Sequence, residues 1–106
     1  MTVRYRWSCQ VLYGKRADFL EVQRKKVELA NSRDWAAASF WESSAGRVND
    51  FFLEREYPTL GDLARELEAR EADYEFMRLM RASYPLVVQG SIVVEIFESV
   101  DPASAL

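Results

Sequence analysis

The sequence contains no histidine and only one cysteine among its 106 residues. Without histidine the chain cannot form a Ser-His-Asp triad, a Cys-His dyad or a histidine-ligated haem, and most zinc and non-haem iron sites are excluded too. The single cysteine, Cys9, cannot form an internal disulfide, which favours a reducing compartment and a cytoplasmic location. It lies in a strand-like run without a base to activate it, so we interpret it as a buried structural thiol. We therefore expect no metal and no cofactor.

The chain also has no long hydrophobic run and no excess of positive charge. No segment approaches eighteen apolar residues, and the N-terminal residues lack an apolar core of signal-peptide length, so we expect no association with a membrane. The formal net charge is −3, whereas a nucleic-acid surface needs a positive field to displace counterions. The one basic cluster, residues 24–26, is flanked by Glu21 and Glu28, which is typical of a solvated helix face. An RNA-recognition module is excluded because residues 47–54 lack its glycines and carry acids.

Aromatic residues are plentiful, with three Trp, five Tyr and six Phe. Aromatic side chains bury large areas, so a thick core or an apolar interface or pocket is expected. The length suits one domain with one core. We expect this domain to span residues 1–100 and to be followed by a flexible C-terminal tail at residues 101–106.

The hydrophobic periodicity predicts four strands and two helical regions. Strands are predicted over residues 3–13, 35–43, 48–57 and 87–99, and helices over residues 16–31 and from residue 60 to Pro85. Thr59 and Asp62 form a variant of the capping box at the start of the second helical region. The apolar stripe of this region jumps around the helical wheel near residues 70–73, which indicates a bend or two short helices.

The element order β-α-β-β-α-β indicates an α+β protein of the ferredoxin-like kind. Right-handed crossovers give one four-stranded antiparallel sheet in the order 4-1-3-2 with the helices on one face. We expect Ile92, Val94 and Ile96 to pack under these helices. Residues 51–53 are consecutively apolar, so the third strand needs cover on both faces. A second copy of the chain on the open sheet face is the simplest cover.

The pattern resembles the dimeric α+β barrel superfamily, in which two ferredoxin-like sheets face each other. The chain is most similar to NIPSNAP-like proteins and more loosely similar to antibiotic-biosynthesis monooxygenases. Residues 10–13 leading into the first helix, Trp35 and Trp41 on the second strand, and the closing run 92–96 carry this resemblance. It implies a homodimer and, if the protein is an enzyme, a cofactor-free monooxygenase, cyclase or isomerase. The superfamily also holds proteins of unknown role, so the fold alone assigns no reaction.

In the cofactor-free oxygenases of this superfamily, Trp, Asn, Tyr or Arg side chains hold the substrate in an apolar pocket. Trp41, Tyr74, Asn49 and Arg55 are residues of those types, but their spacing does not align with the monooxygenase pattern.

Two polar residues on the apolar half of the first helix are the sharpest anomaly. Gln23 and Lys26 are three apart, so their side chains are neighbours, and a buried amide and ammonium need partners or a wet cavity. One interpretation places both in a pocket between helix and sheet. The alternative is that Lys26 reaches the protein edge and Gln23 bonds a backbone group. The aromatic candidates for lining such a pocket, which suit an ordinary core equally well, are Tyr5, Trp7, Trp41 and Tyr74.

A second candidate set is ionic and lies on strands that should be adjacent. It consists of Arg4, Arg6, Glu54 and Glu95. A carboxylate held by arginine is suited to act as a base or to anchor an acidic substrate. The alternative is a structural ion-pair network across a dimer or at a solvated edge.

Two functions follow from these observations. The first is a homodimer that binds or transforms a small apolar or aromatic molecule between sheet and helices. The second is a non-catalytic interaction or scaffold protein whose sheet face is only a dimer interface.

Overall fold

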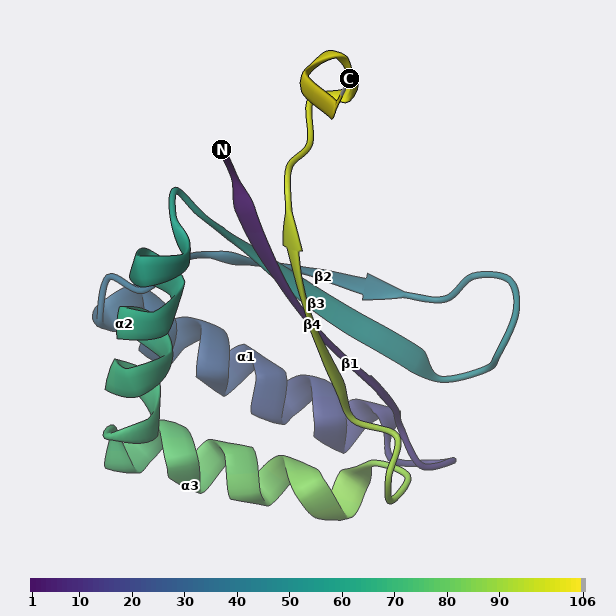
Figure 1. Ribbon diagram of the computed structural model, residues 1–106. Helices are drawn as coiled ribbons and strands as arrows, with labels where there is room; N and C mark the ends of the chain where they lie inside the picture. The colour runs from purple at the N-terminus through teal and green to yellow at the C-terminus, as the bar shows by residue number, and fades with distance from the viewer. Residues whose placement is uncertain (106) are drawn as a thin grey trace.

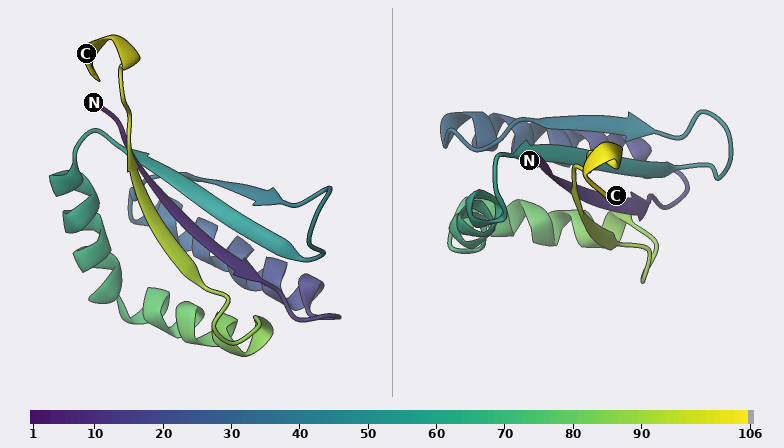
Figure 2. Two further views of the ribbon diagram at one scale, coloured as in Figure 1. Left: turned by 45° about the vertical axis from the view of Figure 1, so that its right-hand side comes forward. Right: turned by 45° about the horizontal axis from the view of Figure 1, so that its top comes forward.

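A four-stranded antiparallel sheet covered on one face by three helices forms the structure, a computed structural model that describes residues 1–105 (Figure 1). The main elements are β1 (Val3–Gln10), α1 (Arg16–Ser32), β2 (Ala38–Glu42), β3 (Asp50–Tyr57), α2 (Leu60–Glu71), α3 (Tyr74–Ser83) and β4 (Val93–Glu98). The strand order β2-β3-β1-β4 is the predicted ferredoxin-like order, read from the other edge. The left view of Figure 2 shows the three helices on the same side of the sheet.

The core forms between β1 and α1, because both elements have the periodicity that the sequence predicts. The odd-numbered residues of β1 are buried and the even-numbered ones are not. On α1, Phe19 is only 2% exposed. Its ring lies 6.5 Å from the ring of Trp7 and 5.2 Å from that of Phe51. Burial of one such side chain stabilises the fold by roughly 1.5–3 kcal/mol, so this aromatic group fixes α1 against the sheet.

The second helical region is split into α2 and α3, as the jump of the apolar stripe predicts. Thr59 caps α2 by accepting a hydrogen bond of 3.1 Å from the backbone N–H of Asp62. Asp73 caps α3 by accepting a hydrogen bond of 3.0 Å from the backbone N–H of Phe76, and it pairs with Arg33 at 2.8 Å. A new cap in the middle of the region starts a second helix in a new direction.

All four strands are shorter than predicted, for identifiable reasons. Trp35 does not belong to β2, because its ring packs edge-on against Phe76 at 5.7 Å. Asn49 has a φ of 65°, which ends strand geometry just before β3. Before β4 the chain turns at Gly90, whose φ is +81°. Val11 and Val87 form only an isolated bridge outside the named strands, and β4 spans Val93–Glu98 instead of residues 87–99.

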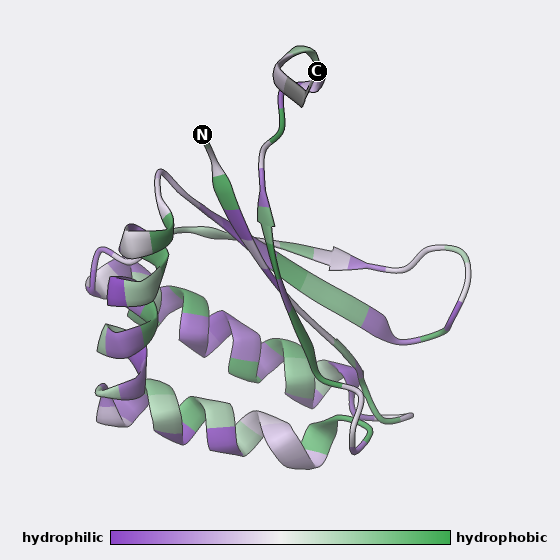
Figure 3. Ribbon diagram, in the orientation of Figure 1, coloured by the Kyte–Doolittle hydropathy of each residue, from purple (hydrophilic) through white to green (hydrophobic). Residues whose placement is uncertain are grey.

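Strand β4 lies at the sheet edge and is exposed along its whole length. Val94 and Ile96 pair with Trp7 and Tyr5 across β1, so they do face the helix side. They nevertheless remain 50% and 49% exposed, so the expectation that they pack under the helices is wrong for these two residues. Ile92, just before β4, is partly buried and packs against the core. The three helices do not cover this edge of the sheet, and Figure 3 shows the apolar residues along it.

The C-terminal tail, expected to be flexible over residues 101–106, forms a short 3-10 turn, η2 (Pro102–Ala105), that projects from the end of the sheet (Figure 1). Leu106 lies outside the described residues. Within residues 1–105, every helix is too short or too polar to cross a lipid bilayer.

Candidate functional site

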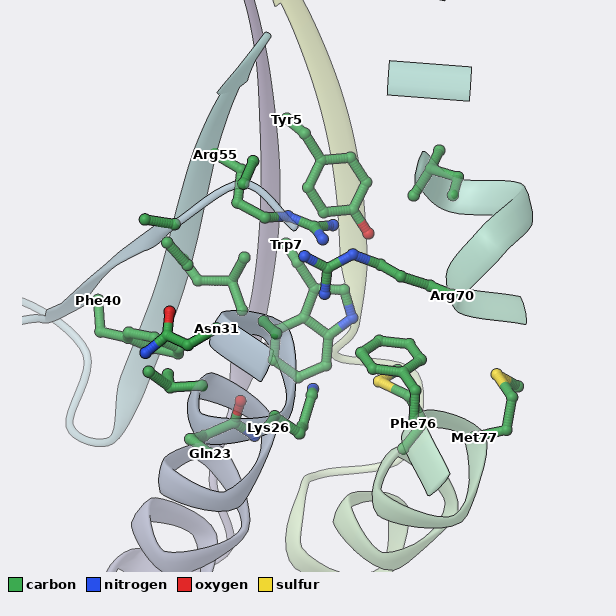
Figure 4. A pocket seen from close by; sticks show the side chains of 18 of the residues that line it. Tyr5, Trp7, Gln23, Lys26, Asn31, Phe40, Arg55, Arg70, Phe76 and Met77 are labelled. Carbon is green, nitrogen blue, oxygen red and sulfur yellow. The ribbon is translucent and has the colours of Figure 1, made fainter. Parts of the chain in front are cut away.

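A cavity of about 420 Å³ lies between the helix-covered face of the sheet and the three helices. This volume falls within the ordinary range for small-molecule sites. Figure 4 shows aromatic and cationic side chains converging on it from both strands and helices. The residues that define its chemistry are Tyr5 and Trp7 of β1, Gln23 and Lys26 of α1, Arg55 of β3 and Arg70 of α2.

The walls around these groups are mostly apolar. Phe40 and Leu53 contribute from β2 and β3, and Phe76, Met77 and Met80 contribute from α3. Aromatic rings and flexible thioethers fit a flat apolar molecule well. The cavity therefore combines an apolar wall with a few polar groups, which is the usual composition of a ligand site.

Lys26 is buried beside two aromatic rings. Its side chain is 8% exposed, and its Nζ lies 5.3 Å from the ring centroid of Trp7 and 5.6 Å from that of Phe76. Burial, followed by the positive charges of Arg55 and Arg70, lowers the pKa of Lys26 to about 8. Since this value is above 7, most molecules carry the charge at neutral pH. Within the basic cluster at residues 24–26, the expectation of a solvated face is thus wrong for Lys26.

Gln23 lies one turn before Lys26 on the same face of α1 and is 3% exposed. Neither its Nε2 nor its Oε1 has a hydrogen-bond partner among the described residues. An unpaired buried amide costs roughly 1–3 kcal/mol. The structure thus places Gln23 and Lys26 together in the cavity, and neither reaches the edge or a backbone group as the alternative requires.

Glu66 of α2 is the carboxylate that balances part of this positive charge. It accepts hydrogen bonds from the backbone N–H of Ala36 at 2.6 Å and from the hydroxyl of Tyr57. Its Oε2 lies 3.2 Å from Nη2 of Arg70 and 3.5 Å from Nη1 of Arg55. Burial raises the pKa of Glu66, but the bonds from Tyr57 and Ala36 and the charges of both arginines outweigh it and hold the pKa below its ordinary value.

The sequence reasoning missed Glu66 and Arg70 and named Arg55 only for its residue type. A signal for Arg55 was available, because it occupies an inward-facing position in the alternation of β3, between Leu53 and Tyr57. Arg70 stands where the apolar stripe of the second helical region breaks. No comparable signal marks Glu66, whose role depends on the tertiary approach of Ala36 and Tyr57.

Two aromatic residues proposed for the pocket lie elsewhere. Trp41 is on the outer face of the sheet, where its ring stacks on Phe52 at 6.1 Å. It pairs with Phe52 in the β2–β3 register, which sets both side chains on the face away from the helices. Tyr74, at the start of α3, is 73% exposed. Of the four aromatic candidates, Tyr5 and Trp7 line the cavity.

The ionic candidates also lie on the outer face, away from the cavity. Arg6 and Glu54 form the expected ion pair at 2.9 Å. Arg4 pairs with Glu56, a residue that the sequence reasoning did not name. Glu95 stands opposite Arg6 across the β1–β4 pair. The exposed sheet face therefore carries two cross-strand ion pairs, and Glu95 lies beside one of them without an ion pair of its own among the described residues.

Cys9 is 4% exposed, and burial raises the pKa of its thiol to about 12. A thiol that stays protonated at neutral pH is a poor nucleophile. No group of three or more His, Cys, Asp or Glu side chains in the described part of the chain is placed to hold a metal ion.

Comparison with known proteins gives matches in structure but not in sequence. The sequence matches no known family and no curated protein. A NIPSNAP family protein from Agrobacterium tumefaciens superimposes with a TM-score of 0.78 at 14% identity, over 95% of this chain and 88% of that chain. An uncharacterized NIPSNAP-like domain protein from Burkholderia xenovorans gives a TM-score of 0.77 at 14% identity, over 95% and 87%.

A third similar structure is SnoaB, a cofactor-independent oxygenase from Streptomyces nogalater. It gives a TM-score of 0.71 at 13% identity, over 94% of each chain. The predicted resemblance to NIPSNAP-like proteins and antibiotic-biosynthesis monooxygenases is confirmed by these structures, and at such identities it establishes the fold.

Proposed function

We propose that this protein is a homodimer that binds a small apolar or aromatic molecule in the cavity between sheet and helices. The observation that carries the proposal is a cavity of about 420 Å³ with apolar walls into which the buried amide of Gln23 and the buried ammonium of Lys26 are built. Leaving such groups unpaired is costly. A site that bound nothing would be more stable with leucine at both positions.

Two of the tryptophans provide a direct test of this proposal, because Trp7 and Trp41 report opposite faces of the sheet. Trp7 lines the cavity, whereas Trp41 lies on the outer face with its indole N–H donated to Ser39 at 3.0 Å. We expect 3-phenylpropanamide, a neutral aromatic probe, to shift the indole N–H signal of Trp7 in a ¹H–¹⁵N NMR titration. The Trp41 signal should stay in place and serves as the internal control.

A titration in which the Trp41 signal moves and the Trp7 signal does not would place the ligand on the outer sheet face and contradict the proposal. A titration in which neither signal moves, repeated with 3-phenylpropionate, would favour the alternative of a non-catalytic scaffold. The monooxygenase, cyclase and isomerase reactions implied by the resemblance all require a bound organic molecule, so this binding test comes before any test of reaction.

The second half of the proposal, the homodimer, is supported by the outer sheet face and by β4. On that face Arg6 lies over the rings of Phe52 and Phe97, at 4.7 and 5.2 Å from their centroids. Phe97 is 41% and Trp41 53% exposed. An exposed edge strand with apolar residues favours association with another chain. Arginines and glutamates alternate on the same face, which lets a second copy meet it with complementary charges.

We expect sedimentation equilibrium to give twice the chain mass of 12.3 kDa. Phe97→Glu places a charge on the outer face and should convert the dimer to monomer, since an unpaired charge in an interface is strongly unfavourable. The matched control is Tyr74→Glu, which makes the same kind of change on the helix side, where Tyr74 is 73% exposed. A wild-type particle of one chain mass, or a dimer insensitive to Phe97→Glu, would contradict this interface.

A further inference from the structure

The cavity holds more positive than negative charge. Lys26, Arg55 and Arg70 all line it, and the carboxylate that contacts the two arginines is that of Glu66. Lys26 has no ion-pair or hydrogen-bond partner among residues 1–105. Glu71 also borders the cavity, but its side chain is exposed to solvent. Three cations thus line the cavity, and two of them, Arg55 and Arg70, share one partly buried carboxylate.

Arg55 is the least satisfied of these cations. It is 5% exposed, and its Nε and Nη1 have no hydrogen-bond partner in the described part of the chain. The distance of 3.5 Å from its Nη1 to Glu66 is longer than the roughly 2.7–2.9 Å of a charge-assisted hydrogen bond. Glu66 is already engaged by Ala36, Tyr57 and Arg70. A second anion would complete the coordination of Arg55.

Aromatic rings hold the three cations in place without neutralising them. The guanidinium of Arg55 lies 4.3 Å from the ring centroid of Tyr5, and that of Arg70 lies 4.7 Å from that of Trp35. Lys26 is held in the same way by Trp7. Cation–π contacts fix the position of a charge but leave its hydrogen-bond donors free. Figure 4 shows the two guanidinium groups next to each other beneath Tyr5, with the Lys26 amine at the other end of the Trp7 ring.

We propose that the molecule bound in this cavity carries a carboxylate, which lies among the Lys26 ammonium and the guanidinium groups of Arg55 and Arg70. This inference rests on the proposed function and adds the chemical class of the ligand, an aromatic or apolar organic acid. The apolar body packs against Phe40 and Met77, and the unpaired amide of Gln23 provides both a donor and an acceptor. The positive charges that lower the pKa of Lys26 are the ones that the carboxylate would balance.

A matched pair of probes tests the carboxylate separately from the aromatic body. 3-Phenylpropionate and 3-phenylpropanamide have nearly the same shape and differ in charge. By isothermal titration calorimetry at pH 7, we expect the acid to bind about tenfold more tightly than the amide, because charge-assisted hydrogen bonds are about twice as strong as neutral ones. Lys26→Met removes the ammonium and keeps the length of the chain up to Cε. It should lower the affinity for the acid about tenfold and leave the affinity for the amide nearly unchanged.

Lys25→Met is the matched control, because Lys25 is the exposed neighbour on the same helix and loses the same charge. It should leave both affinities unchanged. If the amide binds as tightly as the acid, the carboxylate inference is overturned while the proposed function stands. If neither probe binds, the proposed function fails and this inference fails with it. Loss of affinity for both probes in Lys26→Met would assign Lys26 to the aromatic body of the ligand and overturn the proposal as well.

Discussion

Glu66→Gln should lower the free energy of unfolding by about 3 kcal/mol, measured by urea denaturation at pH 7. Removing one partner of a buried ionic cluster leaves the remaining charges unpaired, which costs roughly 3–5 kcal/mol. Glutamine keeps the shape, its carbonyl oxygen can still accept the hydrogen bond from the Ala36 N–H, and its amide N–H can donate to the Tyr57 hydroxyl. Arg55 and Arg70, however, would be left beside Lys26 without their shared carboxylate. The effect should therefore be electrostatic and not a packing defect.

Glu68→Gln is the matched control, because Glu68 lies on the exposed side of the same helix. Its effect should stay within about 0.5 kcal/mol. The pH dependence adds a second check. Because the pKa of Glu66 is lower in the folded protein, its contribution is present above the unfolded pKa and is lost as the pH falls through the folded pKa. The wild type should thus approach the Glu66→Gln variant in acid, and a difference that persists there would contradict this account.

Lys26→Met should have the opposite effect and raise the free energy of unfolding by about 2 kcal/mol at pH 7. The pKa of Lys26 falls from 10.5 to about 8 on folding. A shift of that size corresponds to a cost of about 3 kcal/mol for holding the charged amine in the folded state. Loss of the cation–π contacts with Trp7 and Phe76 offsets about 1 kcal/mol of the gain. Urea denaturation of both proteins measures the net result.

The gain from Lys26→Met should depend on pH in a defined direction. Below about pH 8 the amine is protonated in both states, and the full cost applies. Between pH 8 and 10.5 the unfolded chain binds more protons at this position than the folded one, so the wild type becomes more stable as the pH rises. Cys9, whose pKa burial raises to about 12, destabilises both proteins above pH 9. The difference between variant and wild type therefore isolates Lys26, and it should shrink through this window.

Lys25→Met again serves as the control and should change the free energy of unfolding by no more than about 0.5 kcal/mol. If Lys26→Met destabilises the protein at pH 7, the ammonium contributes more through its contacts than its burial costs. The account of Lys26 as an uncompensated charge would then be wrong.

Hydrophobic periodicity predicted the fold well because the strands show apolar residues at every second position and the helices show an apolar stripe. The alternation of β1 and the stripe of α1 assign a buried face to each, and a conflict between pattern and residue type drew attention to Gln23 and Lys26. Strand ends were predicted less well. They depend on particular backbone angles, such as those of Asn49 and Gly90, which alternation does not report.

The ionic part of the site was harder to predict for a different reason. Arg55, Glu66 and Arg70 come from a strand and a helix whose meeting is decided by tertiary packing. Opposite charges on neighbouring strands were easier to see, and Arg6 and Glu54 do pair. They lie on the other face of the sheet, however, because alternation defines two faces without saying which of them the helices cover.

Arg55 and Arg70 pair with Glu66 in the folded chain, and the same two guanidinium groups would also bind the carboxylate of a ligand. Like charges held close together in the cavity are a source of local frustration, and natural sequences keep such frustration low. An acid that enters the cavity would relieve that frustration and stabilise the folded chain in proportion to its occupancy. By the same reasoning, a substitution at Lys26 that raises the free energy of unfolding would lower the affinity for an acid.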